Sequence, residues 1–123
     1  MKFSTFAAAA ALALAPTTSA WRIYLYNWKD GNADGGYITN SGPGGTGERC
    51  HGTGDMNNKI SSIRWYSKNS ETNPTSQCDV TFYNSLGCQD RLAGPYTLNF
   101  LADASVWDAD NKITSYKTRC WAI

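Results

Sequence analysis

Apolar and polar residues alternate in short runs along residues 21–123, without the spacing of an amphipathic helix over any useful length. The segment Trp21–Tyr26 is aromatic and branched and has no chain breaker, which predicts a strand. The same criteria predict three more strands, at residues 37–39, 48–51 and 60–66. Glycine, asparagine and aspartate residues between them predict turns.

The same scheme then restarts after a polar stretch, residues 67–77, which reads as a linker. Residues 78–84 align with residues 21–27 without a gap, and both segments end in Tyr-Asn. A turn at 85–88 and strands at 95–101 and 113–121 complete the second unit. We therefore predict an all-β antiparallel sandwich with one unit at about 21–66 and another at about 78–121. Each half is expected to form one sheet, with buried aromatic residues between the sheets.

A six-residue motif occurs once in each unit. It reads Asn57-Asn58-Lys59-Ile60-Ser61-Ser62 and then Asp110-Asn111-Lys112-Ile113-Thr114-Ser115. Each copy places oxygen-bearing side chains beside a turn, and such oxygens suit a hard cation such as calcium. The same residue types also form ordinary turns through their own hydrogen bonds, so one copy alone indicates no more than a turn.

The first twenty residues predict a secretory signal peptide. Lys2 gives a positive start, residues 6–14 are apolar, and Thr18-Ser19-Ala20 offers small residues before a cut. We expect a secreted, extracellular product that begins at Trp21 and forms a single domain over residues 21–123. No other segment is long and apolar enough to span a bilayer.

The charge balance excludes some partner classes. Apart from Lys2, basic and acidic residues are equal in number, and neither sign forms a run. This argues against nucleic acid, because such binding depends on neutralising phosphates, and against adsorption to anionic membranes. We expect a monomer.

Four cysteines lie after the predicted leader, which in a small exported chain predicts two disulfides with three alternative pairings. A structural zinc site is disfavoured, because the chain has no Cys-x-x-Cys pair and His51 is its only histidine.

The duplicated motif, following two matching first strands, resembles the βγ-crystallin family, whose domains consist of two Greek-key motifs. The family's calcium signature is two Asn or Asp residues, two variable residues, Ser or Thr, and Ser, and both copies match it. The resemblance spans residues 21–120, and the leader and four cysteines are similar to those of small fungal or microbial members. The family's hairpin pattern of an aromatic residue, six residues, Gly, one residue and Ser is matched by Trp28 and Gly35, but Tyr37 replaces the serine.

The resemblance implies two calcium sites shared between the motifs. The side-chain ligands that it implies are Asn57, Asn58, Ser61, Asp110, Asn111 and Thr114. Main-chain carbonyls near Asp30 and Ser85 would complete the shells, and Ser62 and Ser115 would hold the loops by hydrogen bonds. Because Asp110 is the only acid in the two motifs, we expect weak binding, with Kd on the order of 10⁻⁴–10⁻³ M.

The resemblance also implies a disulfide pairing. In its Greek key, the first and fourth strands of a unit are antiparallel neighbours. Cys78 starts one such strand and Cys120 ends the other, which implies Cys78–Cys120 and leaves Cys50–Cys88 as the second pair.

Catalysis is not expected from this sequence. Glu48, Arg49 and His51 form a cluster like that of small secreted ribonucleases, and this alternative stays open beside an ordinary polar strand. No Gly-x-Ser-x-Gly elbow or phosphate loop occurs.

Three functions therefore remain. The first is a non-catalytic, secreted calcium-binding module, which resembles antimicrobial killer-toxin-like proteins or effectors directed at a host or microbial protein. The second is a lectin-like module that binds cell-wall or cell-surface glycan through surface aromatics. Trp28 and Trp107 are the residues expected to be exposed for that purpose. The third is a ribonuclease.

Overall fold

The computed structural model describes residues 19–44 and 46–123. Of the predicted signal peptide, only Ser19 and Ala20 fall within the described residues, so the rest of that prediction lies outside them. No helix in these two ranges is long and apolar enough to cross a membrane.

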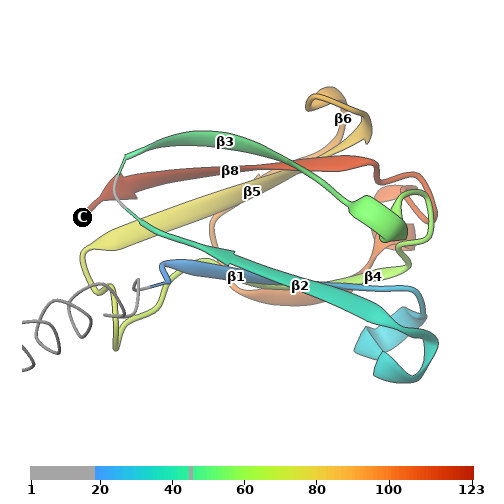
Figure 1. Ribbon diagram of the computed structural model, residues 1–123, viewed down its shortest axis with the longest axis horizontal. Coiled ribbons are helices and arrows are strands. Elements are labelled where there is room, and N and C mark those ends of the chain that lie inside the picture. The colour runs from blue at the N-terminus through green and yellow to red at the C-terminus, as the bar shows by residue number, and fades with distance from the viewer. Residues whose placement is uncertain (1–18, 45) are drawn as a thin grey trace, which may run out of the picture.

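The described chain is all-β, with short 3₁₀ turns in the loops (Figure 1). The strands are β1 (Trp21–Tyr26), β2 (Tyr37–Gly42), β3 (Gly47–Gly52), β4 (Ser62–Tyr66), β5 (Ser76–Ser85), β6 (Gln89–Tyr96), β7 (Phe100–Asp103) and β8 (Ser115–Ala122). The 3₁₀ turns are η1 (Lys29–Gly31), η2 (Ala33–Gly35), η3 (Gly54–Met56) and η4 (Ala104–Trp107).

The strands form two four-stranded antiparallel sheets, ordered β2-β1-β4-β7 and β3-β8-β5-β6. The predicted all-β antiparallel sandwich of two Greek-key units is thereby confirmed. The expectation that each half forms one sheet is wrong, because β3 pairs with β8 and β7 pairs with β4. The third strand of each unit thus crosses to the other unit's sheet, which interlocks the two halves.

One strand prediction in the second unit was also wrong. Residues 95–101 do not form one strand, because β6 ends at Tyr96 and β7 begins at Phe100 in the other sheet. The side chain of Asn99 lies in the crossing between them and accepts hydrogen bonds from the Ser67 N–H at 2.7 Å and the Ser67 hydroxyl at 3.0 Å. Pro95 has no N–H to donate. It is tolerated in β6 because β6 is an edge strand, in which one row of N–H groups has no ladder partners.

The space between the sheets is filled by large side chains that are under 2% exposed. They include Ile23, Leu25, Ile63, Trp65, Val80, Phe82 and Tyr116. Every second residue of β1 and β5 contributes to this core, as expected from the alternation of side chains along a strand, and β5 is also buried at most of its intervening positions.

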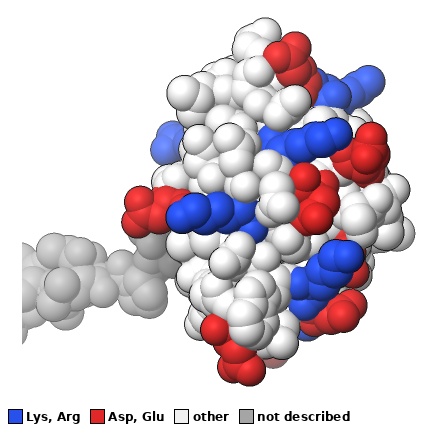
Figure 2. All heavy atoms as spheres, turned by 90° about the vertical axis from the view of Figure 1, so that its right-hand side faces the viewer, with Lys and Arg blue, Asp and Glu red and all other residues white. Residues whose placement is uncertain are grey.

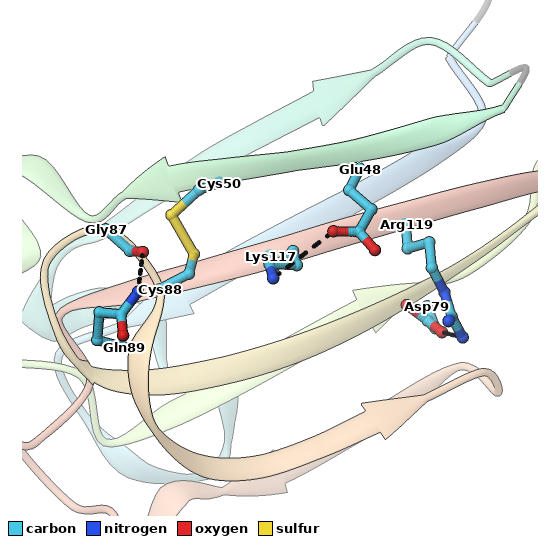
Figure 3. Close-up of polar contacts among 8 residues, drawn as sticks. All are labelled: Glu48, Cys50, Asp79, Gly87, Cys88, Gln89, Lys117 and Arg119. Atoms are coloured by element: carbon cyan, nitrogen blue, oxygen red, sulfur yellow. Dashed lines mark hydrogen bonds and ion pairs between the residues drawn. A yellow bond between two sulfur atoms is a disulfide. The ribbon is translucent and has the colours of Figure 1, made fainter.

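Two disulfides close the fold, and both have the predicted pairing. Cys78 and Cys120 are direct partners across β5 and β8, and both side chains are buried in the core. Cys50 and Cys88 join edge strand β3 to the β5–β6 hairpin (Figure 3). The second bridge therefore fastens the crossed-over strand to the sheet that receives it.

Candidate metal centre

Both six-residue motifs lie at one end of the sandwich, at the right in Figure 1, where η3 and η4 lead into them. Their main chains contact each other reciprocally. The N–H of Asn58 donates to the carbonyl of Ile113 at 3.3 Å, and the N–H of Asn111 donates to the carbonyl of Ile60 at 3.1 Å. The fold thus pairs the two motifs with approximate two-fold equivalence.

The second position of each motif has a left-handed backbone, with φ of 57° at Asn58 and 59° at Asn111. Asparagine adopts this conformation more readily than most residues, so turn geometry alone accounts for its presence here. The position therefore supplies an exposed amide at a fixed place in each loop.

Side chains from the two motifs also meet directly. The hydroxyl of Thr114 donates to the amide oxygen of Asn58 at 3.2 Å. Ser61 and Thr114, the fifth residues of the motifs, are both buried, whereas Asn57, Asn58 and Asn111 are exposed. The result is a set of oxygen atoms that runs from buried hydroxyls to a solvent-exposed rim.

Asp110 supplies the unusual atom of this cluster. Its Oδ1 is buried and has no hydrogen-bond partner, one of only two such side-chain atoms among the described residues that are not exposed. A buried carboxylate oxygen without a donor is costly unless a cation or another group satisfies it. Oxygen donors of this kind, in a set with one carboxylate, suit Ca²⁺ and are poor ligands for softer metals.

Ser62 and Ser115, the last residues of the motifs, hold the hairpin loops as predicted. The Ser62 hydroxyl donates to the carbonyl of Trp28 at 2.6 Å and accepts from the N–H of Gly31 at 2.9 Å. The Ser115 hydroxyl donates to the carbonyl of Ser85 at 2.6 Å and accepts from the N–H of Cys88 at 3.1 Å. Each buried serine fixes the loop that follows the first strand of its unit.

The first hairpin loop packs as its sequence pattern suggests. A side chain at Gly35 would place its Cβ 2.3 Å from Cγ of Trp28, so the indole lies directly on the glycine. Main-chain carbonyls near Asp30 and Ser85 were predicted to complete the calcium shells. The Ser85 carbonyl already accepts a hydrogen bond from the Ser115 hydroxyl. In the other predicted region, the main-chain N–H of Asp30 donates to the Asp103 carboxylate at 2.8 Å.

Acidic and basic side chains are interspersed over the motif end, as Figure 2 shows. Lys112, inside the second motif, lies 3.7 Å from Asp108 in an exposed ion pair. Within residues 19–44 and 46–123, no group of three or more His, Cys, Asp or Glu residues is arranged to hold a metal. Any cation at this end would therefore depend mainly on amide, hydroxyl and carbonyl oxygens.

The cluster around His51 is divided between the two faces of its sheet. The Glu48 carboxylate lies 3.6 Å from Nζ of Lys117 on the outer face, beside Cys50 (Figure 3). The His51 ring instead packs between the sheets, 4.8 Å from the ring of Tyr116 and 5.1 Å from that of Trp21. Its Nε2 lies 2.8 Å from the hydroxyl of Thr118. The Glu48 carboxylate thus faces away from the His51 ring, whereas Arg49 lies near enough to His51 to affect its pKa, and all three residues line one pocket.

Burial, and secondarily the nearby charge of Arg49, lowers the pKa of His51 from its ordinary value near 6.5. The unfolded chain then binds more protons than the folded chain, so the free energy of unfolding falls as pH drops below that value. We expect the melting temperature to fall between about pH 7 and about pH 5. His51→Gln should flatten this dependence in calorimetric scans, and an unchanged slope would contradict the assignment to His51.

The exposed aromatic residues differ from the prediction. Trp28 is 50% exposed, as expected. Trp107 is only partly exposed, because its ring stacks at 5.5 Å on Phe82 and 5.3 Å on Tyr96. Sequence reasoning missed the outward face of the first sheet, where four tyrosines gather. The alternation of Arg22, Tyr24 and Tyr26 with core residues was the signal that could have revealed it.

No family model matches the chain, and a search of curated proteins found no matching relative. Among solved structures, the chain is similar to the N-terminal domain of Protein S, with a TM-score of 0.42 and 16% identity over 83% of this chain and 97% of that one. Similarity at this level carries no information about function.

Proposed function

We propose that the protein is a secreted, non-catalytic calcium-binding module whose two motifs share the ions. The observation that carries the proposal is the buried, unpartnered Oδ1 of Asp110 beside two motifs that are hydrogen-bonded to each other. Asn57, Asn58, Ser61, Asp110, Asn111 and Thr114 would hold the ions, and the cations would neutralise the one carboxylate and tie the loops together.

The rest of the molecule suits this role. Ser62 and Ser115 fix the hairpin loops beside the motifs, so the oxygen atoms are held in place before any ligand arrives. With only one acid among the donors, we expect binding with Kd on the order of 10⁻⁴–10⁻³ M, a range typical of extracellular modules. Secretion is supported by the leader pattern and by two disulfides, which persist in oxidising compartments. Outside the cell, such a module would act as an antimicrobial protein or an effector on a neighbouring organism.

Thermal unfolding of the oxidised protein in EDTA and in ~10 mM calcium tests the proposal. For a Kd near 10⁻⁴ M, each site should add roughly 2.7 kcal/mol to the free energy of unfolding. The melting temperature should therefore rise by several degrees.

Asp110→Asn should remove most of this rise, because it deletes the only charged donor. In EDTA the same variant should be at least as stable as the native protein, since it neutralises a half-buried carboxylate whose Oδ1 has no hydrogen-bond donor. Asp108→Asn is the matched control, because that carboxylate is fully exposed two residues away. A calcium effect that survives Asp110→Asn, or that is lost in Asp108→Asn, would refute the assignment.

A further inference from the structure

The outward side of the sheet β2-β1-β4-β7 carries a distinctive arrangement, which we call the tyrosine–arginine face. Its members are Arg22, Tyr24, Tyr26, Tyr37, Arg64 and Tyr66. In the strand register, Arg22 is opposite Tyr66, and Tyr24 is opposite Arg64. Aromatic and cationic side chains therefore alternate across the two central strands.

The tyrosine rings lie close enough to form one platform. The rings of Tyr24 and Tyr26 are 6.1 Å apart and nearly parallel, at 12°. Tyr37 lies 5.6 Å from Tyr26 and 6.0 Å from Tyr24. Tyr66 stands 6.3 Å from Tyr24 with its ring turned by 77°. Tyr37 and Tyr66 remain 48% and 37% exposed and Tyr24 is half-buried, whereas Tyr26 is only 7% exposed, so Tyr24, Tyr37 and Tyr66 are the rings open to a ligand.

The charge of this face is positive. Arg22 donates to the hydroxyl of Tyr24 at 3.4 Å. Hydrogen bonds with Tyr26, and then with Tyr66, raise the pKa of Arg64, and this guanidinium is always protonated. Along the described strands of this sheet, the one acidic side chain is Asp103 at the edge strand β7, which already accepts the N–H of Asp30.

A groove of about 700 Å³ continues from the platform, at the end of the sheet opposite the motifs. Arg22, Tyr24 and Tyr66 belong to both, and the polar loop 68–72, with Lys68 and Glu71, forms the other wall. Ser19 and Ala20 also line this groove, and both precede the predicted cleavage site. In the mature protein Ser19 and Ala20 would be absent, and the groove would be lined by Arg22, Tyr24, Tyr66 and the loop 68–72.

We propose that the tyrosine–arginine face binds an acidic glycan, a chain of sugar rings that bear carboxylates. The C–H faces of the sugar rings would stack on the tyrosine rings, whose faces carry partial negative charge. Tyrosine supplies rigid contact area with a polar rim, which suits a ligand with alternating apolar faces and hydroxyl edges. Arg22 and Arg64 would pair with carboxylates, which match the planar guanidinium.

Charge complementarity favours this occupant over others. A neutral glycan would leave both guanidinium groups without an anionic partner. A nucleic acid carries a phosphate at every nucleotide and is held by many cationic contacts, whereas this chain has a formal net charge of only +1.

The test uses the mature, oxidised protein in EDTA, so that calcium neither bridges the glycan nor occupies the motifs. Calorimetric titration compares a galacturonate oligomer, the same oligomer with its carboxylates methyl-esterified, and an oligothymidylate. We expect the galacturonate to bind, the methyl ester to bind about tenfold more weakly, and the oligothymidylate to bind no better than the ester.

Arg22→Gln and Tyr37→Ala should each weaken galacturonate binding by about tenfold, because both side chains are exposed on the face. Lys117→Ala, which removes a cation from the outer face of the other sheet, is the matched control and should leave binding unchanged. Melting temperatures without ligand verify that each variant is folded. If Tyr37→Ala is unstable, galacturonate binding by Arg22→Gln alone tests the proposal. Equal binding of the ester, tighter binding of the oligothymidylate, no binding of galacturonate, or loss of binding in Lys117→Ala would each overturn the proposal. Because calcium is absent, failure here leaves the calcium proposal untouched.

Discussion

Replacing Cys78 and Cys120 together with alanine is expected to lower the free energy of unfolding by about 4 kcal/mol. The bridge closes a loop with a sequence separation of 42, and its loss frees the unfolded chain. The two residues are 0% and 8% exposed, so the variant also loses packing in the core. Since small domains are stable by only about 5–15 kcal/mol, this is a large part of the total. Urea unfolding of the oxidised protein measures it.

The comparison is the double replacement of Cys50 and Cys88. These two cysteines have a sequence separation of 38, so removing their bridge should raise the entropy of the unfolded chain by a similar amount. Because Cys50 is exposed, the loss of core packing should be smaller. If the Cys78/Cys120 variant lost less stability than the Cys50/Cys88 variant, the account of the buried bridge would be wrong.

Ser115→Ala should lower the free energy of unfolding by roughly 2–4 kcal/mol. The hydroxyl is 1% exposed and serves both the Ser85 carbonyl and the Cys88 N–H. Deleting it leaves the buried Cys88 N–H and the part-buried Ser85 carbonyl without that partner, and a fully buried group costs about 1–3 kcal/mol. Chemical denaturation of the variant, with the exposed Ser70→Ala as its control, gives the value.

Ser62→Ala should behave in the same way, because its hydroxyl makes the equivalent two bonds in the first unit. Losses below about 0.5 kcal/mol in both variants, the range typical of surface substitutions, would mean that these serines do not hold the loops.

Local patterns predicted the elements that local chemistry determines. The strand Trp21–Tyr26 follows from branched and aromatic residues without a breaker. The turns in the two motifs follow from residues such as Asn58 and Asn111, whose backbones are left-handed. Cys78–Cys120 was instead implied by the resemblance to a Greek-key family, and the register of β5 and β8 places the two residues opposite each other.

The crossing of β3 and β7 between the sheets was not predictable in this way. Alternation shows which side of a strand is buried, but it does not show which sheet the strand joins. The break at residues 97–99 depends on Asn99 meeting Ser67, a contact between residues far apart in the chain. The partial burial of Trp107 was not predictable for the same reason, since Phe82 and Tyr96 come from other strands.

The candidate site was predictable as a set of residues but not as an arrangement. The repeated motif predicts the six oxygen-bearing side chains, whose role as ligands stays a prediction. The contact of Thr114 with Asn58 and the unpartnered Oδ1 of Asp110 exist only once the sandwich forms.

The measurement that tests the calcium proposal most directly is a calcium titration followed by amide NMR spectra of the isotope-labelled protein. We expect saturable shifts confined to residues 57–62, residues 110–115 and the two hairpin loops beside them, with Kd on the order of 10⁻⁴–10⁻³ M. The double replacement Ser61→Arg with Thr114→Arg should abolish them. Shifts that are absent, that do not saturate, that arise elsewhere, or that persist in the double variant would contradict the paired motifs as the calcium site.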